Sequence, residues 1–242
     1  MQAIILAAGS GKRMGCCDIP KVMFKLNDIP LIQHCINNLQ EAGINKTIVV
    51  VGYKKEAVME FLGDKVDYAF QEQQLGTGHA VQCAKDKISH SSVLVCCGDM
   101  PLFHPSTIKK LMQEFKKQNP KIALLSVNFS DPMPWVYGRI VRDEKGQVKS
   151  IVEQKDCNPE QLSIKECNCG FYLFDTEWLK QNLEQLNTDN VQQEYYLTDM
   201  VKLAQEQHQK VIAIPVSDEC EALGVNTPEQ LKMTEECMRK IN

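Results

Sequence analysis

The sequence predicts an α/β protein in which a mostly parallel sheet is flanked by helices on both faces, with a β-rich second half. Through the first 122 residues, short β-branched segments alternate with segments whose apolar residues recur at helical spacing. The expected strands are almost continuously apolar, which is typical of parallel strands buried on both faces. After about Ala123 the long helices become rarer and strands follow one another more closely.

The first half is predicted to alternate four strands with four helices. The strands are Ala3–Ala7, Thr47–Val51, Val66–Phe70 and Val93–Cys97, and the helices are Leu31–Glu41, Lys54–Leu62, Gly78–Lys87 and Pro105–Lys117. The last of these helices begins with proline, whose φ suits a first helical position. It is rich in lysine near its end, where positive charge favours the helix dipole.

The second half is predicted to hold five strands and three helices. The strands are Ile122–Val127, Gly138–Arg142, Val148–Glu153, Cys169–Phe174 and Val211–Pro215, and the helices are Glu177–Leu186, Tyr196–Gln207 and Pro228–Arg239. No linker, repeat or low-complexity segment separates the halves, so we expect one Rossmann-like domain over residues 1–242. Ligands of open α/β sheets bind at the carboxyl ends of the strands. The loops after Ala7, Val51, Phe70 and Cys97 should therefore meet in one crevice.

The composition argues against several classes of protein. Hydrophobic residues make up 43% and charged residues 24% of the 242 positions, as in ordinary globular proteins. The formal net charge is -4 and no basic run interleaved with aromatics occurs, which argues against nucleic-acid binding. No apolar run approaches the roughly 20 residues of a membrane span, and the opening residues lack the basic flank of a signal peptide. We expect a cytoplasmic protein without nucleic-acid or membrane partners, of unknown oligomeric state.

The eleven cysteines are spaced in a way that favours neither disulfides nor a zinc site. Cys16-Cys17 and Cys96-Cys97 are adjacent pairs, Cys167 and Cys169 alternate, and no C-x-x-C occurs. We expect these residues to pack as small hydrophobic side chains.

The first strand leads into a glycine-containing loop, Ala8–Met14. Small residues let the backbone approach a ligand, and consecutive N–H groups can hold phosphate oxygens. The spacing fits neither a P-loop nor a dinucleotide-binding fingerprint, because Met14 stands where a third glycine would be needed, and a plain turn is the alternative. Arg13 and Lys21 beside these N–H groups would supply charge-assisted hydrogen bonds to a triphosphate.

The stretch LAAGSGKRM…DIPK, from Leu6 to Lys21, resembles the signature of the sugar-nucleotide pyrophosphorylases. Further blocks of that pattern recur in order: QEQQLGTGHA (Gln71–Ala80), GDMPL (Gly98–Leu102), YGRIVRD (Tyr137–Asp143), IVEQKD (Ile151–Asp156), EYYLTD (Glu194–Asp199) and GVNTP (Gly224–Pro228). Together they resemble the uridyltransferase domains of the bacterial bifunctional N-acetylglucosamine-1-phosphate uridyltransferase/glucosamine-1-phosphate acetyltransferases. The resemblance covers nearly the whole chain and implies the nucleotide-diphospho-sugar transferase fold. Its nucleotide-binding half would be about residues 1–122 and its sugar-binding half about residues 123–242.

The resemblance implies transfer of UMP from UTP to N-acetylglucosamine 1-phosphate, with release of pyrophosphate. It also implies which residues contact the nucleotide: Ala8 and Gly9 at the loop, Arg13 and Lys21 as catalytic cations at the phosphates, and Gln71, Gly76 and Thr77 at the uracil. An amide side chain and backbone groups can pair with the imide edge of uracil. Thr77 is in addition expected to be the N-cap of the helix that follows it.

Mg²⁺ is the implied cofactor, held by Asp99 and Asn226. A carboxylate at the carboxyl end of a buried strand, beside a phosphate site, is a natural ligand for this ion, and water and phosphate usually complete its shell. The alternative for Asp99 is a turn residue before Pro101.

The implied sugar-binding residues are Gly138, Glu153 and Asn168, whose amide, carboxylate and carboxamide groups could bind hydroxyls and an N-acetyl group. Their structural alternatives are a turn glycine, a solvent-exposed strand residue and a loop amide. A second set from the EYYLTD block, Tyr195, Tyr196 and Asp199, is expected to contribute packing around a helix start rather than direct contacts.

The chain departs from the resembled family in several places. It ends at Asn242 without the hexapeptide-repeat acetyltransferase domain, so we expect no acetyl-CoA binding, no acetyl transfer and no trimerisation through that domain. The chain is thus a standalone enzyme or a piece cut at the domain boundary. One extra residue lies around Gly15-Cys16-Cys17, between Arg13 and Lys21, and Lys12 and Gln193 replace a common Thr and Gly.

A further departure adjoins the expected sugar site. Met133–Val136 interrupts a usually tight turn just before Gly138, and we expect it to remodel the sugar pocket. A pyrophosphorylase for another hexose or amino-sugar phosphate, or for another nucleoside triphosphate, therefore stays open. So does a catalytically silent nucleotide-sugar-binding subunit, although the presence of both cations and both metal ligands argues against it.

Overall fold

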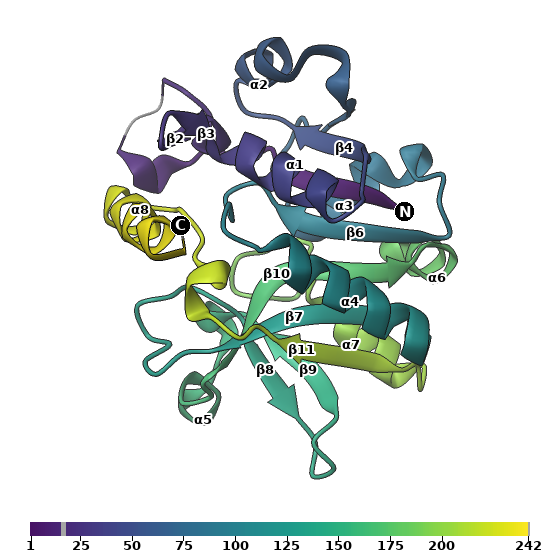
Figure 1. Ribbon diagram of the computed structural model, residues 1–242. Coiled ribbons are helices and arrows are strands. Elements are labelled where there is room, and N and C mark those ends of the chain that lie inside the picture. Colours follow the sequence, from purple (N-terminus) through teal and green to yellow (C-terminus); the bar gives the residue numbers. More distant parts are fainter. Residues whose placement is uncertain (16–17, 242) are drawn as a thin grey trace.

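A computed structural model describes residues 1–15 and 18–241, and its main sheet runs through both halves of the chain (Figure 1). The strand order is β11-β7-β10-β6-β1-β4-β5, with β8 paired to β10 and β9 paired to β8. These strands are β1 (Gln2–Ala7), β4 (Lys46–Val51), β5 (Asp67–Phe70), β6 (Ser92–Cys97), β7 (Ile122–Asn128), β8 (Arg139–Arg142), β9 (Val148–Val152), β10 (Glu166–Asp175) and β11 (Val211–Pro215). Each of them overlaps a strand that the sequence predicts.

The sheet is parallel in its first half and mixed in its second. β1 is parallel to β4 and β6, β4 is parallel to β5, and β11 is parallel to β7. Strand β10 runs antiparallel to β6, β7 and β8, and so joins the two parallel parts. This arrangement confirms the predicted fold class.

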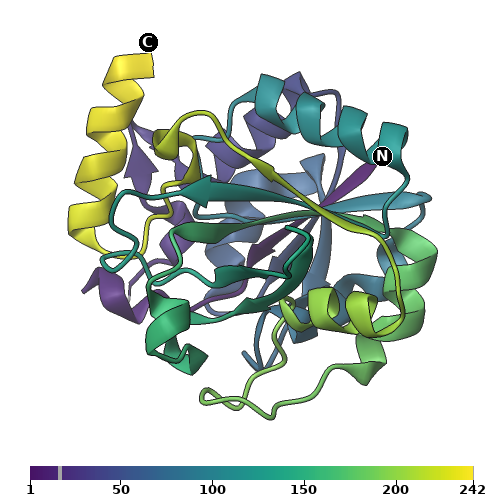
Figure 2. The same ribbon diagram turned by 90° about the horizontal axis from the view of Figure 1, so that it is seen from below.

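Helices cover both faces of the sheet (Figure 2). The side chains of α1 (Leu31–Glu41), α2 (Lys55–Leu62) and α4 (Pro105–Gln118) pack on one face, and those of α3 (Thr77–Ala84), α6 (Thr176–Asn182) and α7 (Asp199–Glu206) pack on the other. Strand β1 shows how the sequence supports this: Ala3 and Ile5 belong to the first core, and Ile4 belongs to the second. Successive strand residues point to opposite faces, so a strand covered on both sides must be apolar throughout.

The remaining elements lie around this sandwich. They are the hairpin of β2 (Lys25–Leu26) and β3 (Ile29–Pro30), the short helix α5 (Pro159–Leu162), helix α8 (Pro228–Ile241), and the 3₁₀ turns Lys12–Met14, Lys21–Met23, Gly63–Lys65, Lys85–Lys87, Gln154–Asp156, Leu183–Gln185 and Glu219–Ala222. Helix α8 packs beside β2 (Figure 1). Among the described residues, no helix combines the length and apolar character that crossing a membrane requires.

Strand β10 contains an irregularity that the sequence did not predict. It begins at Glu166 rather than Cys169, and its register with β7 shifts between Asn168 and Tyr172. Gly170 has φ +64 at this point, a conformation that glycine adopts without steric cost. Because the strand begins at Glu166, Asn168 lies inside it rather than in a loop.

The expectation that no cysteines form a disulfide is wrong at one pair. Cys220 and Cys237 are bonded, with their Cα atoms 5.8 Å apart, and the bond joins the turn Glu219–Ala222 to α8. The two residues are 17 positions apart, and only the reversal of the chain between the turn and the helix brings them together. Cys96, Cys167 and Cys169 are buried among apolar side chains, as predicted.

Reduction of this disulfide should lower the free energy of unfolding by about 3 kcal/mol, the loop-entropy value for a ring of about this size. Urea denaturation with and without dithiothreitol measures the change. The double variant Cys220→Ser/Cys237→Ser should unfold like the reduced wild type and should not respond to the reductant. A wild type equally stable under both conditions would contradict the pairing.

Candidate active site

Two adjoining cavities lie at the carboxyl ends of β1 and β6. The first has a volume of about 260 Å³ and the second about 270 Å³. The first is lined by the residues expected at the nucleotide, Ala8, Gly9, Gln71, Gly76 and Thr77. The second is lined by Arg13, Gly138, Glu153, Asn168 and Asn226. Lys21 and Asp99 line both cavities, so every candidate site residue lies on the wall of one continuous cleft.

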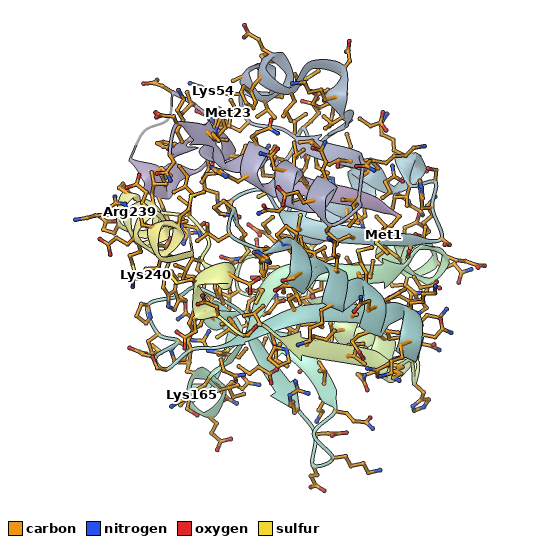
Figure 3. The ribbon with its side chains drawn as sticks, in the orientation of Figure 1. Met1, Met23, Lys54, Lys165, Arg239 and Lys240 are labelled. Carbon is orange, nitrogen blue, oxygen red and sulfur yellow. A yellow bond between two sulfur atoms is a disulfide. The ribbon has the colours of Figure 1, made fainter. Side chains whose placement is uncertain are left out.

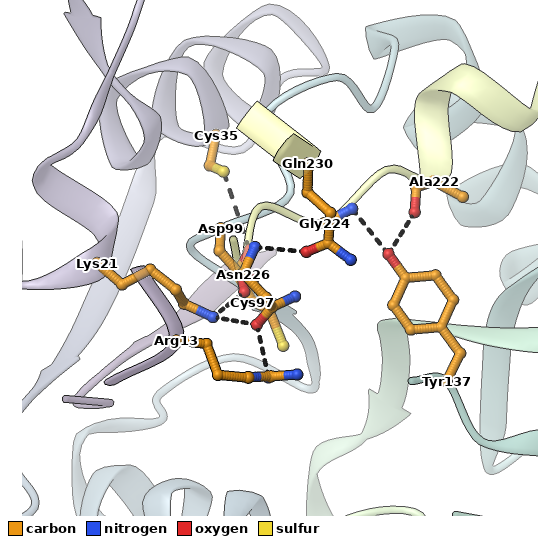
Figure 4. A network of polar contacts seen from close by, with 10 residues as sticks. All are labelled: Arg13, Lys21, Cys35, Cys97, Asp99, Tyr137, Ala222, Gly224, Asn226 and Gln230. Carbon is orange, nitrogen blue, oxygen red and sulfur yellow. Dashed lines mark hydrogen bonds and ion pairs between the residues drawn. The ribbon is translucent and has the colours of Figure 1, made fainter. Parts of the chain in front are cut away.

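A polar centre occupies the junction of the two cavities (Figure 4). The ammonium of Lys21 forms an ion pair with Asp99 and donates a hydrogen bond of 2.7 Å to Oδ1 of Asn226. Arg13 donates to the same oxygen through Nη2, at 3.0 Å. Residues from three distant parts of the chain thus place two cations, one carboxylate and one amide oxygen together.

Glycine is required where the loop after β1 meets the segment of Lys21. Gly11 has φ +63, and a Cβ there would lie 2.8 Å from Cβ of Lys21. The extra residue near Gly15 concerns Cys16 and Cys17, which lie outside the described residues. Lys21 nevertheless reaches the centre, because its ammonium contacts both Asp99 and Asn226.

The wall of the first cavity depends on close backbone contacts. The side-chain amide of Gln71 donates to the carbonyl of Gly76 at 2.9 Å. Gly76 has φ +110, and a Cβ there would lie 2.6 Å from the carbonyl oxygen of Tyr195. The predicted N-cap role of Thr77 is wrong, because Gly76 holds that position. The Thr77 hydroxyl instead accepts a hydrogen bond of 3.0 Å from the backbone N–H of Leu197.

The EYYLTD block braces this wall through its backbone. The N–H of Tyr195 donates to Leu75, and the carbonyl of Tyr195 accepts from Gly78 at 2.7 Å. Because the backbone of Tyr195 is hydrogen-bonded to Leu75 and Gly78, α7 begins at Asp199 and not at Tyr196 as predicted. Glu194 and Thr198 line the cavities, and we did not single them out from the sequence.

The second cavity contains a carboxyl group with a perturbed pKa. The pKa of Glu153 is raised to about 7, mainly by burial and in addition by the charges of Asp156, Asp199 and Glu194, while the hydrogen bond from Thr198 opposes the rise. That hydroxyl donates to Oε1 of Glu153 at 3.2 Å.

Asn168 and Gly138 adjoin Glu153 on the same cavity wall. The carboxamide of Asn168 donates to the Tyr172 hydroxyl at 2.6 Å and accepts from the N–H of Gly170 at 3.1 Å. Both partners come from the irregularity in β10, which therefore orients this side chain. A Cβ on Gly138 would lie 2.7 Å from a methyl of Ile151, so the position admits only glycine without rearrangement.

The insertion Met133–Val136 is anchored rather than loose. Trp135 is buried and stacks on Phe129, with ring centroids 5.4 Å apart. The fully buried guanidinium of Arg139 donates to the carbonyls of Pro132 and Tyr137, at the two ends of the insertion. Val136 is 48% exposed and lines the second cavity. The insertion therefore adds an apolar side chain to the wall next to Gly138.

Comparison with known proteins places the chain in a family. A sequence model of the MobA-like NTP transferase domain matches residues 3–155. The chain belongs to this family. This chain is also similar to curated proteins named "Bifunctional protein GlmU". Those of Exiguobacterium sibiricum, Clostridium botulinum (strain Loch Maree) and Caldanaerobacter subterraneus subsp. tengcongensis are 42%, 44% and 42% identical over 98% of the chain. The chain spans about half of their length, 53%, 52% and 51% respectively.

Solved structures share the fold of the NTP transferase domain at low sequence identity. A UDP-glucose pyrophosphorylase complexed with UDP-glucose superimposes with a TM-score of 0.83 at 21% identity, over 100% of this chain and 99% of the other. A putative glucose-1-phosphate thymidylyltransferase from Bacillus anthracis gives a TM-score of 0.78 at 19% identity, over 100% and 96%.

The oxygen atoms of Asp99 and Asn226 in the polar centre are suitable ligands for a divalent cation. Asp99 and Asn226 place their oxygens within reach of a single cationic group, as the contacts of Lys21 show. Within residues 1–15 and 18–241, no three His, Cys, Asp or Glu side chains gather as a metal site. One carboxylate and one amide oxygen suit Mg²⁺, which keeps several waters and commonly shares phosphate oxygens with its substrate.

Glu153→Gln should change how thermal stability depends on pH. A carboxyl whose pKa is raised on folding contributes full stability below its usual pKa near 4.5, and loses it as pH rises through about 7. The variant lacks this titration, so its Tm relative to wild type should rise between pH 4.5 and 7 and then level off. Differential scanning fluorimetry from pH 4.5 to 9 measures this, with Glu160→Gln on the surface as the matched control. If Tm depended on pH in the same way for wild type and Glu153→Gln, the pKa of Glu153 would not be raised in the folded protein.

Proposed function

We propose that this chain transfers UMP from UTP to N-acetylglucosamine 1-phosphate, giving UDP-N-acetylglucosamine and pyrophosphate, with Mg²⁺ as cofactor. The observation that carries the proposal is the polar centre of Arg13, Lys21, Asp99 and Asn226 at the junction of two cavities. A nucleotidyl transfer needs that layout, because the reacting phosphates of two substrates must meet beside cations. The identity to GlmU proteins over nearly the whole chain supports the choice of substrates.

The reaction is an in-line displacement. An oxygen of the sugar 1-phosphate forms a bond to the α-phosphorus of UTP, and the bond from that phosphorus to the bridging oxygen of pyrophosphate breaks. No covalent nucleophile on the protein is needed, because positioning and charge neutralisation supply most of the rate enhancement in phosphoryl chemistry. Mg²⁺ bound to Asp99 and Asn226 would neutralise phosphate charge. Arg13 and Lys21 offset the charge that builds up on the leaving pyrophosphate.

The remaining candidate residues orient the two substrates. The backbone at Ala8 and Gly9 would approach the triphosphate, and among the described residues no atom lies within 4 Å of the position that a Cβ on Gly9 would take. Gln71, Gly76 and Thr77 form the wall for the uracil. Gly138, Glu153 and Asn168 would bind the sugar, and an analogue lacking a hydroxyl or acetamido group would leave these polar groups unpaired.

A second candidate is a pyrophosphorylase for a different amino-sugar or hexose 1-phosphate. The insertion Met133–Val136 favours it, because Val136 adds apolar surface to the cavity wall beside Gly138.

Pyrophosphate release should be fastest with UTP and N-acetylglucosamine 1-phosphate. A coupled pyrophosphate assay over a panel of nucleoside triphosphates and sugar 1-phosphates, each with Mg²⁺, measures this. Faster release with another sugar 1-phosphate would replace the first candidate by the second. No release with any pair would reject catalysis and leave a nucleotide-sugar-binding protein.

Arg13→Ala and Asp99→Ala should each lower kcat roughly 10²- to 10³-fold, the scale of losing one preorganised charged contact. Both variants should keep the far-UV circular dichroism spectrum of wild type, because both side chains lie at the cleft. Arg239→Ala is the matched control: this residue lies on the outer side of α8 (Figure 3) and pairs only loosely, at 4.0 Å, with Glu235. Near-normal turnover in a folded Arg13 or Asp99 variant would reject the proposed roles.

A further inference from the structure

The segment that carries Asn226 is short and is held in place by few polar contacts. It runs from Ala222, at the end of a 3₁₀ turn, to Pro228, at the start of α8. The N–H of Val225 donates to the carbonyl of Asp99 at 2.9 Å, and the N–H of Asn226 donates to the side-chain oxygen of Gln230 at 2.8 Å. These bonds tie the segment to the strand end that carries Asp99 and to the first turns of α8.

A third tie comes from Tyr137, whose hydroxyl lies beside the backbone of Ala222 and Gly224 (Figure 4). Its hydroxyl accepts a hydrogen bond from the N–H of Gly224 at 2.7 Å and donates one to the carbonyl of Ala222 at 2.8 Å. A Cβ on Gly224 would lie 2.8 Å from this hydroxyl oxygen, so glycine is what admits the contact. One side-chain group thus satisfies two backbone groups, two and four residues before Asn226.

The ring of Tyr137 is fixed by aromatic neighbours. Its centroid lies 5.9 Å from that of Phe129 and 6.2 Å from that of Trp135, which belongs to the insertion. Burial and the charge of Asp99 raise the pKa of the phenol well above its ordinary value, so the hydroxyl keeps its proton and remains a donor. The insertion therefore does more than line the cavity beside Gly138. Its Trp135 also packs against Tyr137, the residue that holds the Asn226 segment.

We propose that Tyr137 is a positioning residue for Asn226: its hydroxyl fixes the backbone from Ala222 to Gly224 so that the amide oxygen of Asn226 lies beside Asp99. By holding Asn226 in this position, Tyr137 raises the affinity of the cleft for a divalent cation. This inference rests on the proposed function, since Asp99 and Asn226 are the proposed ligands. Groups that orient metal ligands commonly change metal affinity about 10- to 100-fold when removed.

The direct test measures cation binding without turnover. Mn²⁺ is titrated into the protein in the presence of UTP alone, and free Mn²⁺ is followed by electron paramagnetic resonance. Tyr137→Phe keeps the ring and removes the two hydrogen bonds, and it should bind Mn²⁺ roughly 10-fold more weakly or worse. Tyr68→Phe is the matched control, because its hydroxyl donates 2.7 Å to the carbonyl of Gly63 at the far edge of the sheet. The control should bind Mn²⁺ like wild type.

A kinetic readout separates positioning from general damage. In the pyrophosphate assay, Tyr137→Phe should need roughly 10-fold more Mg²⁺ for half-maximal rate and should regain near-wild-type kcat at saturating Mg²⁺. Unchanged Mn²⁺ affinity in a folded Tyr137→Phe would overturn the inference, as would a loss of kcat that Mg²⁺ does not restore. If this variant does not fold, Gly224→Ala displaces the hydroxyl from the other side. It should weaken Mn²⁺ binding equally, and wild-type affinity there would overturn the inference.

The two proposals fail in different ways. Wild-type protein that binds Mn²⁺ with UTP but releases no pyrophosphate would reject the proposed function, and the resonance titration would still decide the role of Tyr137. Wild-type protein that releases pyrophosphate while Tyr137→Phe keeps wild-type metal affinity would reject only the role of Tyr137.

Discussion

The contact on which this cleft depends is the ion pair between Lys21 and Asp99. A carboxylate that is almost fully buried needs a compensating charge and hydrogen bonds, since desolvation would otherwise disfavour its ionised form. Asp99 lies at the end of β6, in the middle of the sheet, and Lys21 follows the loop after β1. The pair therefore requires that two neighbouring parallel strands end at the same level, as they do here, where Leu6 of β1 is paired with Cys97 of β6. Asn226 completes the arrangement, because its amide oxygen accepts hydrogen bonds from both Lys21 and Arg13.

The order of strands and helices could be predicted from the sequence because it depends on local patterns. Continuous apolar runs marked the buried strands, and apolar residues at helical spacing marked α1, whose predicted bounds match those observed. What failed depends on contacts between distant residues. The first residue of α7 is displaced because Tyr195 is hydrogen-bonded to Leu75 and Gly78, and the register of β10 against β7 shifts between Asn168 and Tyr172. The Cys220–Cys237 bond likewise needs a chain reversal that spacing does not reveal.

The position of the candidate site could also be predicted, because parallel strands deliver their following loops to one edge of the sheet. Every residue expected to contact the nucleotide, the sugar or the metal lines the resulting cleft. The supporting residues could not be found in this way. Arg139 looks like an ordinary charged strand residue, yet it is fully buried and holds both ends of the insertion. Tyr137 belongs to a recognisable block, but nothing in the sequence indicates that its hydroxyl reaches a segment 87 positions away.

Under the proposed function, the wall that the two cavities share determines how far the specificity for the base and the specificity for the sugar can be changed separately. Lys21 and Asp99 belong to both, whereas Gln71 and Gly76 belong only to the first and Gly138 and Asn168 only to the second. An engineer could therefore exchange base preference and sugar preference independently by working on the outer walls, which come from opposite halves of the chain. At the junction, a substitution of Lys21 or Asp99 would affect the binding of both proposed substrates, because these residues line both cavities.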